Sequence, residues 1–74
     1  MILVVDAQSP LTVREQHILY YTARGLSNKE IASRLSISEQ TVKSHLANMI
    51  AKSRKANRAA LVAYGFEANI LRSR

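Results

Sequence analysis

Residues 27–51 decide the fold, and they read SNKEIASRLSISEQTVKSHLANMIA. Ser27 and Glu30 have the spacing of a capping box, in which each side chain accepts a hydrogen bond from the other residue's backbone N–H. Apolar residues follow at helical spacing, so the pattern predicts a short helix over residues 28–35. A two-residue Ser-Ile turn then leads directly into a second capped segment.

Ser38 caps this second segment, which we predict to be a helix over about residues 39–52. One of its faces is apolar and consists of Val42, Leu46, Met49 and Ile50. The opposite face has polar or short side chains and consists of Gln40, Lys43, Ser44, Ala47, Asn48 and Ala51. Such a helix can bury one side and press the other into the major groove of DNA, which is about 12 Å wide. Two capped helices joined by a tight turn are typical of helix-turn-helix DNA-binding proteins.

Capping signals also mark a helix on each side of this unit. Thr12 and Glu15 form another capping box, which predicts a helix over residues 13–24 that ends before a glycine. Asn57 is the expected N-cap of a last helix over about residues 58–68. The sequence therefore predicts an all-α domain of four helices.

The first residues are expected to form a short apolar arm. We place the boundary at Pro10, so that residues 1–10 are the arm and residues 11–74 are the helix-turn-helix domain. The opening MILVV has no basic leader and no small-residue cleavage pattern, so we expect neither a secretory signal nor a membrane span. Because the chain has no cysteine, packing and association must stabilise so small a fold.

The last predicted helix has more apolar surface than one core can cover. One stripe, formed by Leu61, Val62 and Gly65, can face the core. A second stripe would then stay in water, and it consists of Ala59, Ala63, Phe66 and Ile70. We expect a second copy of the chain to cover this stripe in a homodimer. The alternative is that the apolar arm folds back over it.

The charge of the chain favours a polyanionic partner. Eleven basic residues against five acidic ones give a net charge of +6 and a pI of about 10.4. No acidic residue lies between Glu39 and Glu67, a window that contains five lysines and arginines. Since this window includes the second helix of the helix-turn-helix unit, we expect double-stranded DNA as the partner.

The titratable residues offer no pattern for catalysis or metal binding. His17 and His45 lie on different predicted helices, and Glu15 and Glu30 each belong to a capping box. Since no nucleophile has an adjacent base, we expect no enzyme activity, no cofactor and no metal. We expect core or dimer packing, rather than stacking on single-stranded bases, for Tyr20, Tyr21 and Tyr64.

Three segments together resemble a known family. They are LTVREQHIL at residues 11–19, ARGLSNKEIASRLSISEQTVKSHLANM at residues 23–49, and Asn57-Arg58. Over about residues 11–71 the chain is similar to the LuxR-type (GerE-like) DNA-binding domain of bacterial transcription regulators. The resemblance implies a four-helix domain that binds DNA as a dimer, with the last helix forming much of the dimer contact.

The resemblance also implies which residues meet DNA. It places Lys43, Ser44 and Ala47 at the base edges. It places five further residues at phosphates or at points that fix the helix against the DNA backbone, namely Asn28, Lys29, Thr41, His45 and Lys52. The chemistry agrees, because a lysine can donate to the O6 and N7 acceptors of guanine, a serine can donate or accept, and an alanine offers only a methyl contact. Backbone N–H groups at the start of the helix at residue 28 suit a phosphate.

The chain departs from the family pattern at two turns. Ser53-Arg54-Lys55 stands where the family usually has Leu-Gly-Val, so the third helix can run longer or the turn can be looser. Arg54 and Lys55 could extend the phosphate contacts. Asn69 stands where the family often has glycine, and because asparagine tolerates the left-handed conformation, we expect this helix end to be kept.

The sequence thus predicts a cytoplasmic, nucleoid-associated transcription regulator that binds DNA as a homodimer. RNA polymerase or another regulator is a further candidate partner, and with no room for a sensor domain, control would come from protein amount or from a partner. An alternative is an interaction module that antagonises a full-length LuxR-type regulator through its last helix. A promoter-recognition region of a sigma factor has a similar pattern, but the His45-Leu46-Ala47-Asn48 run and the solitary domain argue against it.

Overall fold

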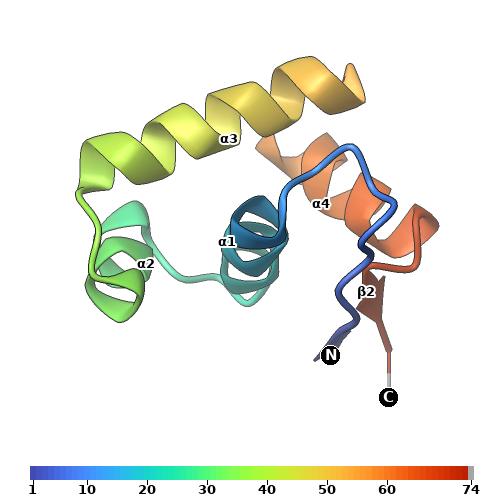
Figure 1. Ribbon diagram of the computed structural model, residues 1–74, viewed down its shortest axis with the longest axis horizontal. Coiled ribbons are helices and arrows are strands. Elements are labelled where there is room, and N and C mark those ends of the chain that lie inside the picture. The colour runs from blue at the N-terminus through green and yellow to red at the C-terminus, as the bar shows by residue number, and fades with distance from the viewer. Residues whose placement is uncertain (74) are drawn as a thin grey trace.

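Four helices and a two-stranded sheet make up the computed structural model, which describes residues 1–73. In chain order the elements are β1 (Ile2–Leu3), α1 (Val13–Ala23), α2 (Asn28–Leu35), α3 (Glu39–Ser53), α4 (Arg58–Glu67) and β2 (Leu71–Arg72). Figure 1 shows α3 lying across α1 and α2, with α4, β2 and both chain ends at the other end of the molecule. The predicted all-α class and the four helices are confirmed, and the small sheet is a minor addition.

The predicted capping residues begin all four helices. The Thr12 hydroxyl accepts from the Glu15 N–H at 3.1 Å, and the Glu15 carboxylate accepts from the Thr12 N–H at 2.9 Å. The capping box of α2 has the same reciprocal bonds, and Ser38 and Asn57 cap α3 and α4. Predicted and observed helix ends differ by at most one residue, because each end is set by these local bonds and by turn residues.

A residue with positive φ follows each of the four helices, Gly25 after α1 and a non-glycine residue after each of the other three. Ser36 has φ 56° at the end of α2, and Ile37 donates its N–H back to the Ala32 carbonyl at 3.0 Å. Arg54 has φ 57°, so the altered Ser-Arg-Lys turn still closes α3, one residue later than predicted. Asn69 has φ 61°, which confirms the expected conformation after α4.

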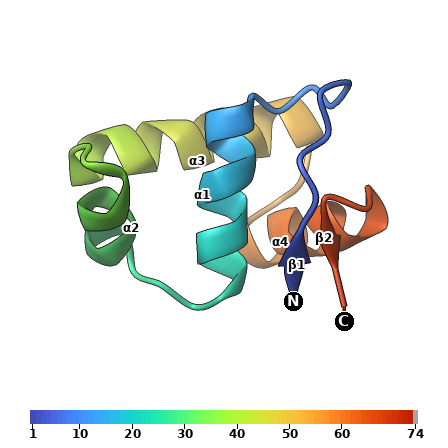
Figure 2. The same cartoon turned by 60° about the horizontal axis from the view of Figure 1, so that its bottom comes forward.

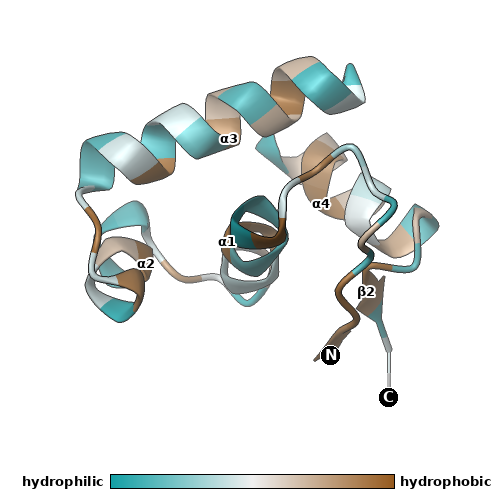
Figure 3. Ribbon diagram, viewed as in Figure 1, coloured by the Kyte–Doolittle hydropathy of each residue, from teal (hydrophilic) through white to brown (hydrophobic). Residues whose placement is uncertain are grey.

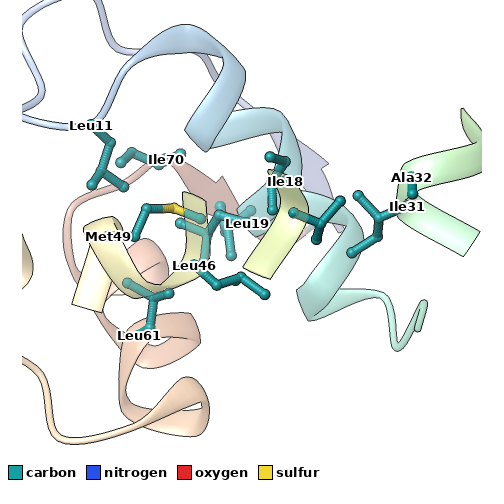
Figure 4. Close-up of a cluster of buried hydrophobic side chains, with 11 residues drawn as sticks. Leu11, Ile18, Leu19, Ile31, Ala32, Leu46, Met49, Leu61 and Ile70 are labelled. Atoms are coloured by element: carbon teal, nitrogen blue, oxygen red, sulfur yellow. The ribbon is translucent and has the colours of Figure 1, made fainter. Parts of the chain in front are cut away.

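The core is built from all four helices and the C-terminal strand. Val42, Leu46 and Met49 of α3 are buried, as the apolar stripe predicted. All three belong to one core cluster. Figure 4 shows Leu46 and Met49 beside side chains of α1 and α4, with Ile31 and Ala32 of α2 at one end. Burial of this stripe leaves the opposite side of α3 facing away from the core.

The arm is packed onto the domain rather than free. Its strand β1 pairs antiparallel with β2, and the Val4 N–H donates to the Ile70 carbonyl at 2.7 Å. Gln16 of α1 is fully buried; its amide NH₂ donates to the Asp6 carbonyl at 2.8 Å, and its amide oxygen accepts from the Asp6 N–H at 2.8 Å. One side chain of α1 thus fixes the backbone of the arm.

Ile70 corrects one prediction about the last helix. We expected it on the exposed stripe, but it is fully buried and belongs to the core. The reason is that α4 ends at Glu67 and the left-handed Asn69 turns the chain, so Ile70 does not follow the helical register. The remaining members of that stripe, Ala59, Ala63 and Phe66, are exposed.

Candidate nucleic-acid interface

The longest helix, α3, presents a row of exposed polar and short side chains on its outward side. The three predicted base-contacting residues, Lys43, Ser44 and Ala47, are all exposed on it. The other residues of the predicted outward face are exposed as well, namely Gln40, Asn48 and Ala51. In Figure 3, teal bands of hydrophilic residues recur along the length of α3 and alternate with pale and brown ones. The outward side combines donors, acceptors and short side chains, which allows close approach to base edges.

A buried carboxylate ties α3 to α1 and fixes the angle of this surface. Glu15 is only 2% exposed, and its Oε1 accepts from the Lys52 ammonium at 2.7 Å. His45 places its Nδ1 3.9 Å from the other carboxylate oxygen, Oε2. Burial raises the pKa of Glu15, but the hydrogen bonds from Lys52 and Thr12 and the Lys52 charge outweigh burial, so the pKa lies below its ordinary value.

This arrangement gives Lys52 a structural partner that sequence reasoning missed. We predicted Lys52 at a phosphate, and 37% of its side chain is exposed, yet its ammonium is already paired with Glu15. The prediction of a phosphate contact stays a prediction for both Lys52 and His45. No local signal indicated the ion pair, because its partners are separated by 37 positions in the sequence.

The start of α2 is the second part of the candidate interface. Ile31 donates the first intrahelical hydrogen bond, to the Ser27 carbonyl, and Ser27 caps the N–H of Glu30, so the N–H groups of Asn28 and Lys29 precede this bonding. Such N–H groups, together with the positive end of the helix dipole, suit a phosphate. The Lys29 side chain is exposed, which would add a charge there.

Arg58 holds this end of α2 against the start of α4. Its Nη2 donates to the Oδ1 of Asn28 at 2.5 Å, so the Asn28 side chain, predicted to contact a phosphate, has a partner within the protein. From the sequence, Arg58 was one of the basic residues of the acid-free window, the start of the last helix and part of the family resemblance, with no partner assigned. Because the partners are 30 positions apart, a contact of this kind leaves no local pattern.

The other predicted phosphate residues lie at opposite ends of α3. Thr41 is exposed in the first turn, and its hydroxyl shares a 2.8 Å hydrogen bond with that of Ser38. Arg54 is exposed just after the last turn. The ammonium nitrogen of the next residue, Lys55, lies 5.9 Å from the centre of the Tyr64 ring on α4. The extension of phosphate contacts through Arg54 stays a prediction.

The predicted dimer residues form a short exposed row on α4. Ala59 and Ala63 are exposed one turn apart, and Phe66 follows with 40% of its surface exposed. The N-terminal arm is hydrogen-bonded to the Ile70 backbone, whereas these three residues stay exposed. Part of the apolar surface that we expected on the last helix is therefore available to a partner.

Two negative findings apply to residues 1–73. No group of three or more histidine, cysteine, aspartate or glutamate side chains in this range is placed to hold a metal ion. Within the same residues, no helix combines the length and the apolar character needed to cross a membrane.

Comparison with known proteins gives consistent matches. Residues 9–64 match the GerE model of bacterial regulatory proteins of the luxR family. The nitrate/nitrite response regulator NarP of Escherichia coli K12 is 57% identical over 47 residues, which are 64% of this chain and 22% of NarP. The response regulator VraR of Staphylococcus aureus Mu3 is 43% identical over 61 residues, which are 82% of this chain and 29% of VraR. The chain therefore spans less than a third of these relatives.

Solved structures agree with the sequence matches. The structure of the transcription factor GerE superimposes with a TM-score of 0.85 at 34% identity, covering 88% of this chain and 97% of GerE. The response regulator ChrA of a heme-sensing two-component system superimposes with a TM-score of 0.78 at 35% identity, covering 89% of this chain and 33% of ChrA. Both the sequence and the arrangement of the helices thus match GerE and bacterial response regulators.

Proposed function

Because the chain belongs to the LuxR family of bacterial regulatory proteins, we propose that it binds a specific double-stranded DNA site as a homodimer, with α3 in the major groove. Membership makes the chain a DNA-binding domain of a LuxR-family transcription regulator.

One observation carries the proposal, namely that α3 buries one side and leaves the other free. Val42 and Met49 are fully buried, whereas Lys43, Ser44 and Ala47 are exposed on the opposite side. In this proposal Lys43 donates to guanine O6 and N7, Ser44 donates or accepts at the neighbouring base, and Ala47 contacts a thymine methyl.

Phosphate contacts flank these base contacts and position α3. Lys29 and the free N–H groups at the start of α2 would hold a phosphate on one side. Thr41 and Arg54 would reach phosphates near the two ends of α3, and His45 and Lys52 lie between them. Each neutralised phosphate lowers the slope of log affinity against log salt by about 0.9.

The exposed row of Ala59, Ala63 and Phe66 supports a homodimer. Small residues one turn apart allow two copies of α4 to approach closely, and Phe66 would bury its ring against the partner. Two copies related by a two-fold axis would read a pseudo-palindromic site, with half-sites about one helical turn of DNA apart.

Selection of bound duplexes from a random pool tests the function directly. We expect enrichment of one pseudo-palindromic motif, and a sedimentation experiment with that duplex should give two chains for each site. Enrichment of no motif, with equal affinity for every duplex, would contradict sequence-specific binding.

The exposed row of α4 also supports the alternative of an interaction module. In that case the chain would use Ala59, Ala63 and Phe66 to occupy the dimer face of a full-length LuxR-type regulator. A gel shift separates the two functions, because a pure antagonist would bind a regulator and no duplex. The exposed outward side of α3 favours DNA binding. A regulator of this kind would act in the cytoplasm at the nucleoid, with RNA polymerase as a further partner.

A further inference from the structure

The outward face of α1 is a second surface, and DNA binding by α3 does not use it. The residues that α1 turns inward include Glu15 and Leu19, which are buried. At about 100° for each residue, the opposite side of the helix falls near His17 and Arg24. Because Glu15 on the inward side contacts Lys52 of α3, this opposite side points away from α3. Figure 2 shows α1 and α2 in front of α3. We call the opposite side the α1 face, and it includes the adjoining end of α2.

One half of the α1 face is an open hollow of about 250 Å³. It lies between the start of α1 and the end of α2 and is lined by Val13, Arg14, His17 and Leu35. Val13 is 50% exposed, the largest exposed fraction among the big apolar residues described. The hollow therefore offers an apolar floor beside basic side chains.

The other half of the α1 face is a set of tyrosines and arginines in contact. The rings of Tyr20 and Tyr21 lie 5.5 Å apart between their centres. Arg24 lies 5.6 Å from the centre of the Tyr20 ring and donates to its hydroxyl at 3.2 Å, and Arg34 lies 5.6 Å from the centre of the Tyr21 ring. These contacts hold the rings in place before binding, which lowers the entropic cost of association.

The composition of this face is that of a protein contact. Tyrosine and arginine are enriched at the energetic centres of interfaces, and a shallow apolar hollow can receive one side chain of a partner. No carboxylate is among the eight residues of the two halves. The nearest acidic residue on α2, one turn before Arg34, is Glu30, and its carboxylate accepts the Ser27 N–H in the capping box.

Charge decides which partner fits. Three exposed arginines, Arg14, Arg24 and Arg34, attract an acidic group and repel a second copy of the same face. Arginine clusters with apolar pockets recognise acidic motifs that also carry an apolar side chain. We infer that the α1 face docks an acidic segment of another protein, with a leucine or phenylalanine entering the hollow and aspartate or glutamate meeting Arg24 and Arg34.

Selection of randomised short peptides on the immobilised chain tests this inference without using DNA. Each round is counter-selected on the doubly reversed variant R24E/R34E, so that peptides that bind α3 or α4 are removed. We expect the remaining peptides to be acidic and to contain an aliphatic or aromatic residue. They should bind R24E/R34E roughly tenfold or more weakly, because like charges then face each other.

Two controls keep the result specific. Arg72→Glu reverses an exposed arginine on β2, outside the α1 face, and should leave peptide affinity unchanged. Val13→Asp tests the hollow separately from the arginines, and it should weaken the same peptides. Circular dichroism melts establish that each variant is folded.

The inference is overturned if no acidic peptide survives counter-selection, or if the amide shifts caused by the selected peptides map to α3. It is also overturned if single-stranded oligothymidylate, rather than peptide, loses affinity on R24E/R34E. A separate titration with duplex DNA distinguishes these outcomes from a failure of the proposed DNA binding, because R24E/R34E should still prefer the selected duplex over its single-base variants, as the native chain does.

Discussion

Replacing Lys52 with alanine is expected to destabilise the fold, although Lys52 lies on α3, the helix that we propose to bind DNA. The substitution leaves the Glu15 carboxylate 2% exposed and without its 2.7 Å ammonium partner. Breaking a fully buried pair costs about 3–5 kcal/mol, and an exposed pair contributes about 0–1 kcal/mol. Because 37% of the Lys52 side chain reaches water, we expect an intermediate cost of about 1–3 kcal/mol.

Thermal unfolding followed by circular dichroism measures this cost. For a domain of this size, each kcal/mol lowers the melting temperature by about 4–8 °C. Lys29→Ala is the matched control, since it removes an exposed lysine from α2 and should leave the melting temperature nearly unchanged.

The pH dependence of the stability gives a second test of the ion pair between Glu15 and Lys52. The pKa of Glu15 is lowered in the folded chain from an ordinary value of 4.5, so its stabilisation is fully present above that value and is lost as the pH falls through the lower folded pKa. The native chain and Lys52→Ala should therefore differ most near neutral pH and converge in acid. Equal stability at neutral pH, or a difference that grows in acid, would refute the role of this pair.

Three further predictions follow from other contacts. Lys43→Ala should relax sequence preference at one base pair and cost about 1–3 kcal/mol there, which competition between the selected duplex and its single-base variants measures; a uniform loss on all duplexes would show that Lys43 contacts phosphate instead. Phe66→Glu should shift sedimentation from dimer to monomer while leaving the melting temperature of the monomer unchanged, and a persistent dimer would place the interface elsewhere. Gln16→Ala should lower stability by about 1–3 kcal/mol and speed hydrogen exchange at the Asp6 and Val4 amides, because the arm loses its side-chain partner; unchanged exchange would mean that β1 and β2 hold the arm alone.

Local signals predicted the helices well because a helix begins and ends at hydrogen bonds between near neighbours. Thr12 with Glu15 and Ser27 with Glu30 are three positions apart, and both capping boxes form as expected. The apolar stripe of α3 is likewise a local pattern. It predicted which side of the helix faces the core, and the burial of its residues agrees.

Contacts between distant residues could not be predicted in this way. The strands β1 and β2 have two residues each, so they carry no periodicity, and their pairing joins the two ends of the chain. The contacts of Glu15 with Lys52 and of Asn28 with Arg58 also join residues that are far apart in the sequence, so no local pattern indicates them. Ile70 was misplaced because the helical register was extended past the end of α4, although Asn69 was expected to leave that register.

Titration of the isotope-labelled chain with the selected duplex, followed by amide chemical shifts, tests the central claim most directly. We expect the largest shifts at Lys43, Ser44 and Ala47 on α3, with a second set at Asn28 and Lys29 at the start of α2. Shifts confined to α1 or α4, with α3 unperturbed, would contradict it.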